Sequence, residues 1–320
     1  MISLRQIRSF VAVYEEGSFT GAARREGATQ SGISQHLKQL ESELGVALLE
    51  RNRRDVEPTL AGKLYYRECV EVLKRLEAAQ QSVSVHHVRG AIRVGLMPTF
   101  TRSVLAPALD KFLKSAPGSE ISVTEAYSGV LTEMILEGDL DFAVVPAFEG
   151  ATGISHRLLA RDREMLVRAK RGKSASLKPV KLSELGPLKV VLPGLQNTRR
   201  RNIETYFSVN GVTVAQRLEL DAMMGTLQFV AASDWVAILP FIMMVSDLKD
   251  GRFDVMPLDE PPFYSEFVLI EPARKVMSPA AALFADLLKM EAEKSRLLFE
   301  ECTGGRQLLR RQVRPVTRRR

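Results

Sequence analysis

The chain has 320 residues, which is enough for two or three domains, and its 45% hydrophobic content is ample for buried cores. It contains no run of 18 apolar residues, so the sequence predicts no membrane span, and its first residues lead into an amphipathic helix rather than a signal peptide. The net charge of +7 comes from seven arginines after residue 305, so the preceding chain is neutral overall and its charge alone does not indicate nucleic-acid binding.

The first 30 residues predict two short helices that lead to a third. Apolar side chains at helical spacing indicate a helix that is broken near Gly17, and Ser18 is placed to cap the next helix. Gly27 ends that second helix, and Thr29 is placed to cap the third. The apolar stripe of the first helix is Leu4, Ile7, Val11 and Tyr14. Three short helices in this order indicate a helix-turn-helix.

The third predicted helix, over residues 30–41, has two different faces. Ile33, Leu37 and Leu40 form an apolar stripe that packs inward. The other face carries short hydroxyl and amide side chains and one lysine, which suit base edges and phosphates. The predicted DNA-binding residues on this face are Gln30, Ser31, Ser34, Gln35 and Lys38.

A short extended segment follows this helix. Arginines at 51, 53 and 54 stand beside Val56 and Pro58, a pattern typical of a wing that contacts backbone phosphates or the minor groove. Arg53 and Arg54 are the predicted phosphate contacts of this wing.

Together these residues resemble the LysR-type transcriptional regulators. The resemblance is dense over residues 4–10, 17–23, 30–45, 48–51 and 59–62, and continues more loosely to about residue 300. It implies a winged helix-turn-helix, all-α with a small β wing, over residues 1–58. It also places Gln30, Ser31, Ser34 and Gln35 at positions that approach bases. Two departures are Ser31-Gly32, where the family usually has Pro-Ala, and Leu49, where it usually has Phe.

Residues 59–89 predict a long linker helix that pairs with a second copy of the chain. A seam with 3,4 spacing runs through Tyr66, Cys69, Leu73, Leu76, Gln80 and Val83. A lone helix of this length and polarity would be marginally stable, which favours a dimer. The alternative is a helix that packs only on its own chain.

Residues 90–300 alternate between strands and helices, which predicts α/β folding with a mainly parallel sheet. Strands are expected at 91–96, 121–125, 140–145, 189–192, 215–220, 235–239 and 268–270, and a last helix from about Ser278. The resemblance implies an effector domain of two lobes that looks like a periplasmic binding protein. Lobe I covers about 90–162 and 266–300, and lobe II covers about 163–265.

Candidate effector-binding residues follow the predicted strands, where ligands of such lobes sit. The resemblance implies that Thr99, Thr101, Ser128 and Thr198 bind effector carboxylates. Arg102 and Arg199 add positive charge, which suggests a small anionic metabolite. An apolar wall is expected from Phe100, Phe148 and Met223. The alternative is that the hydroxyl groups only cap helices.

The sequence therefore predicts a DNA-binding transcriptional regulator controlled by a small molecule, with no cofactor and no metal. Its expected partners are double-stranded DNA with a dyad-symmetric operator, the effector, a second copy of the chain in a homodimer or homotetramer, and RNA polymerase. A ligand-independent regulator or architectural DNA binder is the alternative; an enzyme is disfavoured because no catalytic motif follows a strand.

The remaining features concern the cysteines, the histidines and the C-terminus. Cys69 and Cys302 are expected to be free thiols in a reducing cytoplasm, and the four histidines form no metal-binding pattern. Residues 301–320 are expected to form a disordered basic tail, which is either a nonspecific DNA arm or a solvated end.

Overall fold

The computed structural model describes residues 1–51, 56–83, 91–148, 150–171, 177–195 and 197–304. The chain divides into two compact units. The first comprises residues 1–87, 150–155 and 272–278, and the second comprises 88–149, 156–271 and 279–320. No helix within the described ranges is long and apolar enough to cross a membrane.

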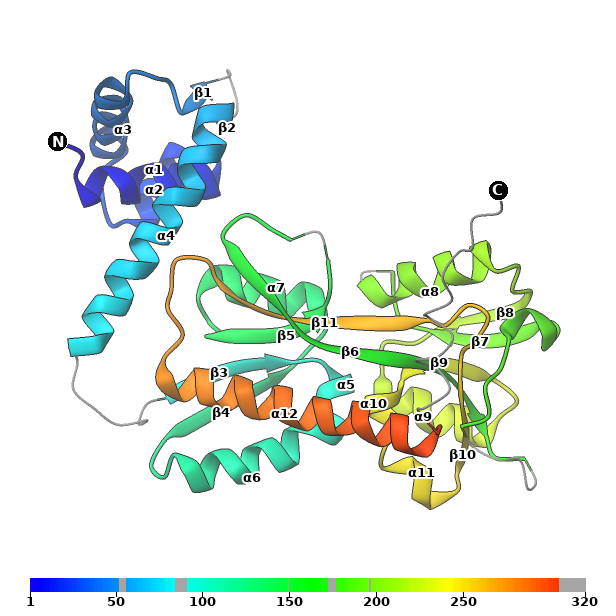
Figure 1. Ribbon diagram of the computed structural model, residues 1–320. Helices are drawn as coiled ribbons and strands as arrows, with labels where there is room; N and C mark the ends of the chain where they lie inside the picture. Colours follow the sequence, from blue (N-terminus) through cyan, green and yellow to red (C-terminus); the bar gives the residue numbers. More distant parts are fainter. Residues whose placement is uncertain (52–55, 84–90, 149, 172–176, 196, 305–320) are drawn as a thin grey trace, which may run out of the picture. The chain divides into compact units, whose positions relative to one another are not determined.

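The first unit begins with three helices, α1 (Leu4–Glu16), α2 (Phe19–Arg25) and α3 (Gln30–Leu44) (Figure 1). Ser3 caps α1 in a reciprocal arrangement with Gln6, in which each side chain accepts from the other residue's backbone N–H. Ser18 accepts a hydrogen bond from Gly21 N, and Thr29 accepts one from Gly32 N. Both predicted caps are therefore confirmed.

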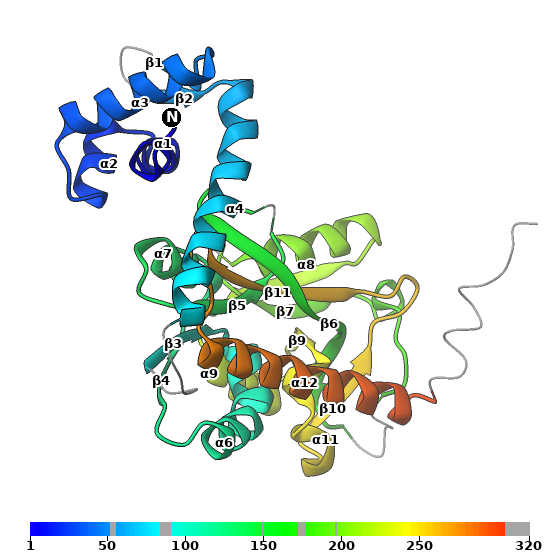
Figure 2. The ribbon, with the colours of Figure 1, turned by 60° about the vertical axis from the view of Figure 1, so that its left-hand side comes forward.

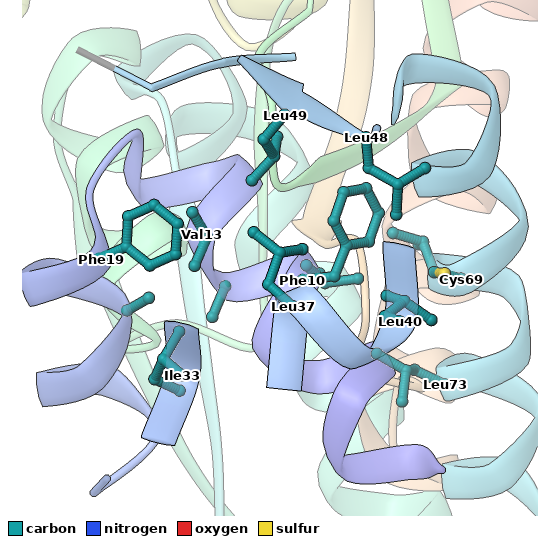
Figure 3. Packing of buried hydrophobic residues seen from close by; sticks show 14 of the residues in the cluster. Phe10, Val13, Phe19, Ile33, Leu37, Leu40, Leu48, Leu49, Cys69 and Leu73 are labelled. Carbon is teal, nitrogen blue, oxygen red and sulfur yellow. The ribbon is translucent and has the colours of Figure 1, made fainter. Parts of the chain in front are cut away.

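A short wing and a long helix complete this unit. Strands β1 (Leu49–Arg51) and β2 (Val56–Pro58) pair antiparallel, and α4 (Leu60–Val83) follows. Figure 3 shows Phe10, Val13 and Leu37 in the shared core, close to Cys69 and Leu73 of α4. The fold class predicted for the N-terminal region, a winged helix-turn-helix, is the one observed.

Two residues of the predicted dimer seam on α4 do not face outward, and the pairing of this helix with a second copy stays a prediction. Cys69 and Leu73 are only 2% and 7% exposed, because they complete the core of their own unit. Among the side chains of α4 that the structure describes, the large apolar ones exposed to solvent are Leu60, Leu64 and Val72. The 3,4 spacing indicates an apolar helix face correctly, but it does not tell whether the partner is the same chain or another copy.

Two distant segments of the chain belong to the first unit through polar contacts. The Tyr66 hydroxyl donates to Glu15 Oε1 at 2.7 Å and accepts from Gly153 N at 3.2 Å. Arg274 lies 3.6 Å from a carboxylate oxygen of Glu15 and 3.6 Å from one of Glu26. The unit is therefore built from three separate stretches of sequence.

The second unit is a mixed sheet in the order β4-β3-β5-β11-β6-β9-β7-β8, with β10 paired to β6 (Figure 1). One half, β4-β3-β5, is parallel, and so is the other, β9-β7-β8. The long strands β6 and β11 run between the halves (Figure 2). The strands are β3 (Ala91–Leu96), β4 (Glu120–Glu125), β5 (Phe142–Pro146), β6 (Ile154–Ala169), β7 (Leu188–Leu192), β8 (Val214–Glu219), β9 (Val236–Pro240), β10 (Phe253–Pro257) and β11 (Tyr264–Pro272).

Helices cover the sheet, and the last of them contacts elements of both halves. In α12, Phe284 packs edge-on against Phe112 with ring centroids 5.2 Å apart, and Phe299 packs against Phe241 at 5.0 Å. This α/β architecture agrees with the predicted two-lobed effector domain. The helices are α5 (Pro98–Phe100), a π-helical turn (Thr101–Leu105), α6 (Ala106–Ser115), α7 (Ser128–Glu137), a 3-10 turn (Leu182–Glu184), α8 (Thr198–Val209), α9 (Met223–Ala232), α10 (Phe241–Met244), α11 (Asp247–Asp250) and α12 (Pro279–Cys302).

Candidate DNA-recognition helix and effector cavity

Helix α3 presents the polar face that the sequence predicts. Ile33, Leu37 and Leu40 are buried at 1% exposure or less, and the opposite face is open to solvent. On that face Gln30, Ser31, Gln35 and Lys38 are exposed, and Ser34 is half-buried. Amide and hydroxyl groups on an exposed helix face of a helix-turn-helix are suited to reading base edges in the major groove.

The start of α3 is adapted to its glycine. Thr29 Oγ1 accepts from Gly32 N at 3.1 Å and lies 3.1 Å from Ser31 Oγ. A Cβ atom at Gly32 would lie 3.2 Å from the same oxygen, which is tight. Glycine at this position therefore leaves room for the Thr29 hydroxyl group, which caps the exposed first turn of α3.

A polar contact that the sequence analysis did not identify holds α3 against α1. Ser9 is buried, and its Oγ lies 2.9 Å from His36 Nδ1. The sequence shows a serine among apolar residues of the first helix, which could have indicated a buried polar partner. That partner, His36, lies 27 residues further along the chain. Together with the buried stripe of Ile33, Leu37 and Leu40, this contact helps to orient α3 and its polar face. Arg53 and Arg54 lie outside the described residues.

The second unit contains a cavity of about 20 Å³ at the carboxyl ends of β3, β7 and β9. Three residues predicted from the sequence line it, namely Thr99, Arg199 and Met223. Thr99 is fully buried, and its Oγ1 has no hydrogen-bond partner among the described residues. A volume of this size holds about one water molecule. The remaining lining residues are Met97, Pro98, Tyr127, Val191, Leu192, Pro193, Asn197, Leu220, Thr226, Ala237, Ile238 and Leu239.

Two other predicted effector residues, Thr101 and Arg102, lie away from this lining. The Thr101 hydroxyl donates to Pro98 O and to the Glu125 carboxylate. Arg102 forms an ion pair with the buried Asp247 and donates to the backbone oxygen of Met243 at 2.9 Å. The charge of Arg102 therefore already has a partner in this chain, and its predicted role in effector binding stays a prediction.

The other predicted residues are held by packing or by helix starts. Phe100 packs edge-on against Phe267 at 5.0 Å in the core, and Phe148 lies 6.3 Å from the ring of His156. Ser128 and Thr198 are the first residues of α7 and α8. None of these four lines the described cavity, and the N-caps of α7 and α8 are Tyr127 and Asn197 and not the two hydroxyl residues.

A buried ion pair, which sequence reasoning missed, lies behind the cavity. Arg199 Nη2 is 2.8 Å from each carboxylate oxygen of Glu164 and 3.1 Å from Ile238 O. Glu164 also accepts the hydroxyl of the buried Ser265. Glu164 comes from β6, Arg199 from α8 and Ser265 from β11, so the pair links the two long strands to the cavity wall. Because Glu164 and Arg199 are 35 positions apart, the sequence alone does not show that they form a pair.

Asp162 is a second buried carboxyl group on β6. It accepts from Ile242 N at 2.6 Å, and burial, together with the charge of Glu164, raises its pKa to about 7. Because the folded pKa is above the unfolded value near 3.8, the folded state binds the proton more tightly. Stability should therefore fall as pH rises between about 4 and 7.

We expect Asp162→Asn to remove this pH dependence. The wild-type second unit should lose stability between pH 5 and pH 7 at up to about 1 kcal/mol per pH unit, relative to the variant. Urea midpoints of both proteins at pH 5 and pH 8 measure the difference. If the urea midpoints of the two proteins differed by the same amount at pH 5 and at pH 8, Asp162 would not be the cause of the pH dependence.

Comparison with known proteins agrees with both parts of the structure. Residues 4–63 match the family "Bacterial regulatory helix-turn-helix protein, lysR family", and residues 86–293 match the "LysR substrate binding domain". The nitrogen assimilation regulatory protein nac of Escherichia coli (strain K12) is 27% identical over 292 residues, 90% of this chain and 94% of that protein. The regulator BenM of Acinetobacter baylyi is 28% identical over 246 residues, 75% of this chain and 80% of that protein.

Solved structures of full-length regulators share the fold. Full-length BenM has a TM-score of 0.56 at 23% identity and covers 92% of this chain and 98% of its own. CbnR, a LysR family transcriptional regulator, has a TM-score of 0.54 at 23% identity and covers 89% and 99%. Since the substrate-binding domain alone matches well over half of the sequence, the chain belongs to the LysR-type transcriptional regulators.

Proposed function

We propose that this regulator reads a dyad-symmetric operator through α3, with Gln35 and Ser34 at its centre. The observation that carries the proposal is the face of Gln30, Ser31, Gln35 and Lys38, which is exposed while the opposite face of the same helix is buried. Amide side chains can pair with adenine in the major groove, and lysine contacts guanine or phosphate. Arg53 and Arg54 of the wing segment supply phosphate contacts in this proposal.

The proposal includes a homodimer, because one recognition helix reads only a half-site. A twofold dimer places two such helices one turn of DNA apart, about 34–36 Å. Leu60 and Leu64, one turn apart on α4, and Val72 further along the helix are exposed apolar side chains that a second copy can cover. In this proposal these side chains replace the buried Cys69 and Leu73 of the expected seam.

An effector bound in the cavity of the second unit completes the proposed function. The effector would act by favouring one of two arrangements of the dimer, which requires that it bind one of them more tightly. Thr99, with its unpartnered hydroxyl group, is the residue we assign to ligand contact. We assign the chain no catalytic role, and it would act in the cytoplasm with the DNA.

We expect Gln35→Ala to reduce specific DNA affinity by about 100-fold while nonspecific affinity stays the same. Each bidentate base contact contributes about 1–3 kcal/mol, and a dimer loses two. The measurement is fluorescence anisotropy with a duplex selected on the wild-type protein from a random pool, beside an unrelated duplex. Ser42→Ala, an exposed change on the same helix, is the control. Unchanged affinity for the selected duplex would remove Gln35 from base recognition.

A further inference from the structure

We infer that the cavity of the second unit takes an uncharged organic effector, with an apolar body and one amide or hydroxyl group, and disfavours carboxylates. This inference rests on the proposed role of the cavity as the effector site. It replaces the anionic metabolite that Arg102 and Arg199 suggested in the sequence.

The charge of the arginine at the cavity is already compensated. Arg199 and Glu164 have side chains 3% and 1% exposed, and Arg199 Nη2 contacts both carboxylate oxygens of Glu164. Such a charge-assisted pair is electrically neutral as a unit. A carboxylate ligand would have to be desolvated beside a second carboxylate, which makes its burial unfavourable.

Two backbone donors beside the cavity already have acceptors within the protein. Gly194 N, in the loop after β7, donates to Asp221 Oδ1 at 2.8 Å. At the start of α8, Arg199 N donates to the side chain of Asn197 at 3.0 Å. At these two positions the protein itself supplies the acceptor that an effector carboxylate would otherwise provide.

Two carboxylates act on the side of the cavity that Tyr127 lines. The pKa of Tyr127, a lining residue, is raised first by burial and then by the charges of Asp221 and Glu125, which Arg199 opposes less strongly. An anion entering beside Tyr127 would meet the same two carboxylates. Arg102 does not offset them, because it is paired with Asp247.

The groups that remain suit a neutral molecule. Among the residues that line the cavity, two buried polar atoms have no hydrogen-bond partner in the described part of the chain, namely Thr99 Oγ1 and Arg199 Nε. A carbonyl or hydroxyl oxygen can accept from either of them, and leaving them unpaired is unfavourable. The apolar lining is Met97, Pro98, Val191, Leu192, Pro193, Leu220, Met223, Ala237, Ile238 and Leu239. Since the cavity holds about one water molecule, a larger ligand must widen it on entry.

The test is thermal unfolding of the full chain with matched sets of small molecules. The sets are benzoate, benzamide and benzyl alcohol, and isovalerate, isovaleramide and isoamyl alcohol. We expect an amide or alcohol at about 100 times its Kd to raise the melting temperature of the second unit by roughly 5–10 °C. The matching carboxylate should give no rise. A larger rise with the carboxylate than with its neutral partners would overturn the inference.

Two variants test the stated cause. Glu164→Gln uncovers the charge of Arg199 and should create a response to benzoate. Because Glu164 is buried, the exposed Asp221→Asn serves as the second variant and should narrow the difference between carboxylate and amide. Asp110→Asn, with a side chain 61% exposed on α6, is the matched control and should leave the difference unchanged. If the carboxylate and the amide differed as much in their effect on the melting temperature of Asp221→Asn as on that of the wild type, the electrostatic argument would be contradicted.

Operator binding is measured on the same samples, so that the two proposals can fail separately. A wild-type protein that binds its selected duplex but responds to no member of either set counts against the ligand inference alone. A protein that enriches no duplex from the random pool counts against the proposed function.

Discussion

Replacing Arg199 with methionine is expected to destabilise the second unit by about 3–5 kcal/mol. The change leaves Glu164, which is fully buried, without the guanidinium group that contacts both of its carboxylate oxygens. Ser265 alone then hydrogen-bonds a buried carboxylate. Urea unfolding followed by circular dichroism measures the loss as a lower midpoint of the second unit.

Two further variants separate the buried charge from simple loss of packing. The double variant Glu164→Gln with Arg199→Met should recover much of the loss, because no unpaired charge remains. Lys189→Met breaks an exposed pair with Asp234 and should cost less than about 1 kcal/mol. A midpoint for Arg199→Met as close to the wild type as that of Lys189→Met would show that the buried pair does not stabilise this unit.

The second large effect is expected for Gly62→Ala in the first unit. A Cβ atom at Gly62 would lie 2.0 Å from the backbone oxygen of Leu48, which is closer than real contacts allow. That oxygen also accepts from Thr59 N at 3.0 Å, so moving it disrupts the junction of wing and α4. We expect a loss of about 3 kcal/mol, at the upper end for overpacking.

Thermal unfolding and operator affinity together measure this effect. Gly129→Ala is the matched control, because Gly129 is also helical and has no atom within 4 Å of the added Cβ position. That control should leave the melting temperature unchanged or slightly higher. If Gly62→Ala melted like the control, the close approach of α4 to Leu48 would be refuted.

Local signals in the sequence predicted the local structure well. The caps at Ser18 and Thr29 depend on a side chain and a backbone N–H three residues apart, so a short stretch of sequence contains the whole interaction. The buried strand predicted over 91–96 coincides with β3, since an apolar segment bounded by turn residues needs no distant information.

Long-range partners could not be predicted in the same way. The strand β6 (Ile154–Ala169) is not among the predicted strands, because its buried polar residues Asp162, Arg163 and Glu164 do not look like a strand interior. Glu164, which neutralises the charge of Arg199, lies 35 residues away in the sequence. The sequence alone therefore suggested that Arg199 was free to bind an anion. The burial of Cys69 likewise depends on packing against helices that are far away in the sequence.

The contacts of Tyr66 and Arg274 bear on how such regulators can be recombined. The DNA-binding unit includes residues 150–155 and 272–278, which are continuous with β6, β11 and the start of α12. Exchanging effector domains between relatives at the linker would therefore replace Gly153 and Arg274, the partners of Tyr66 and Glu15. Functional chimeras should need these two short segments to match the helix-turn-helix they accompany, so the two modules are expected to diversify together rather than independently.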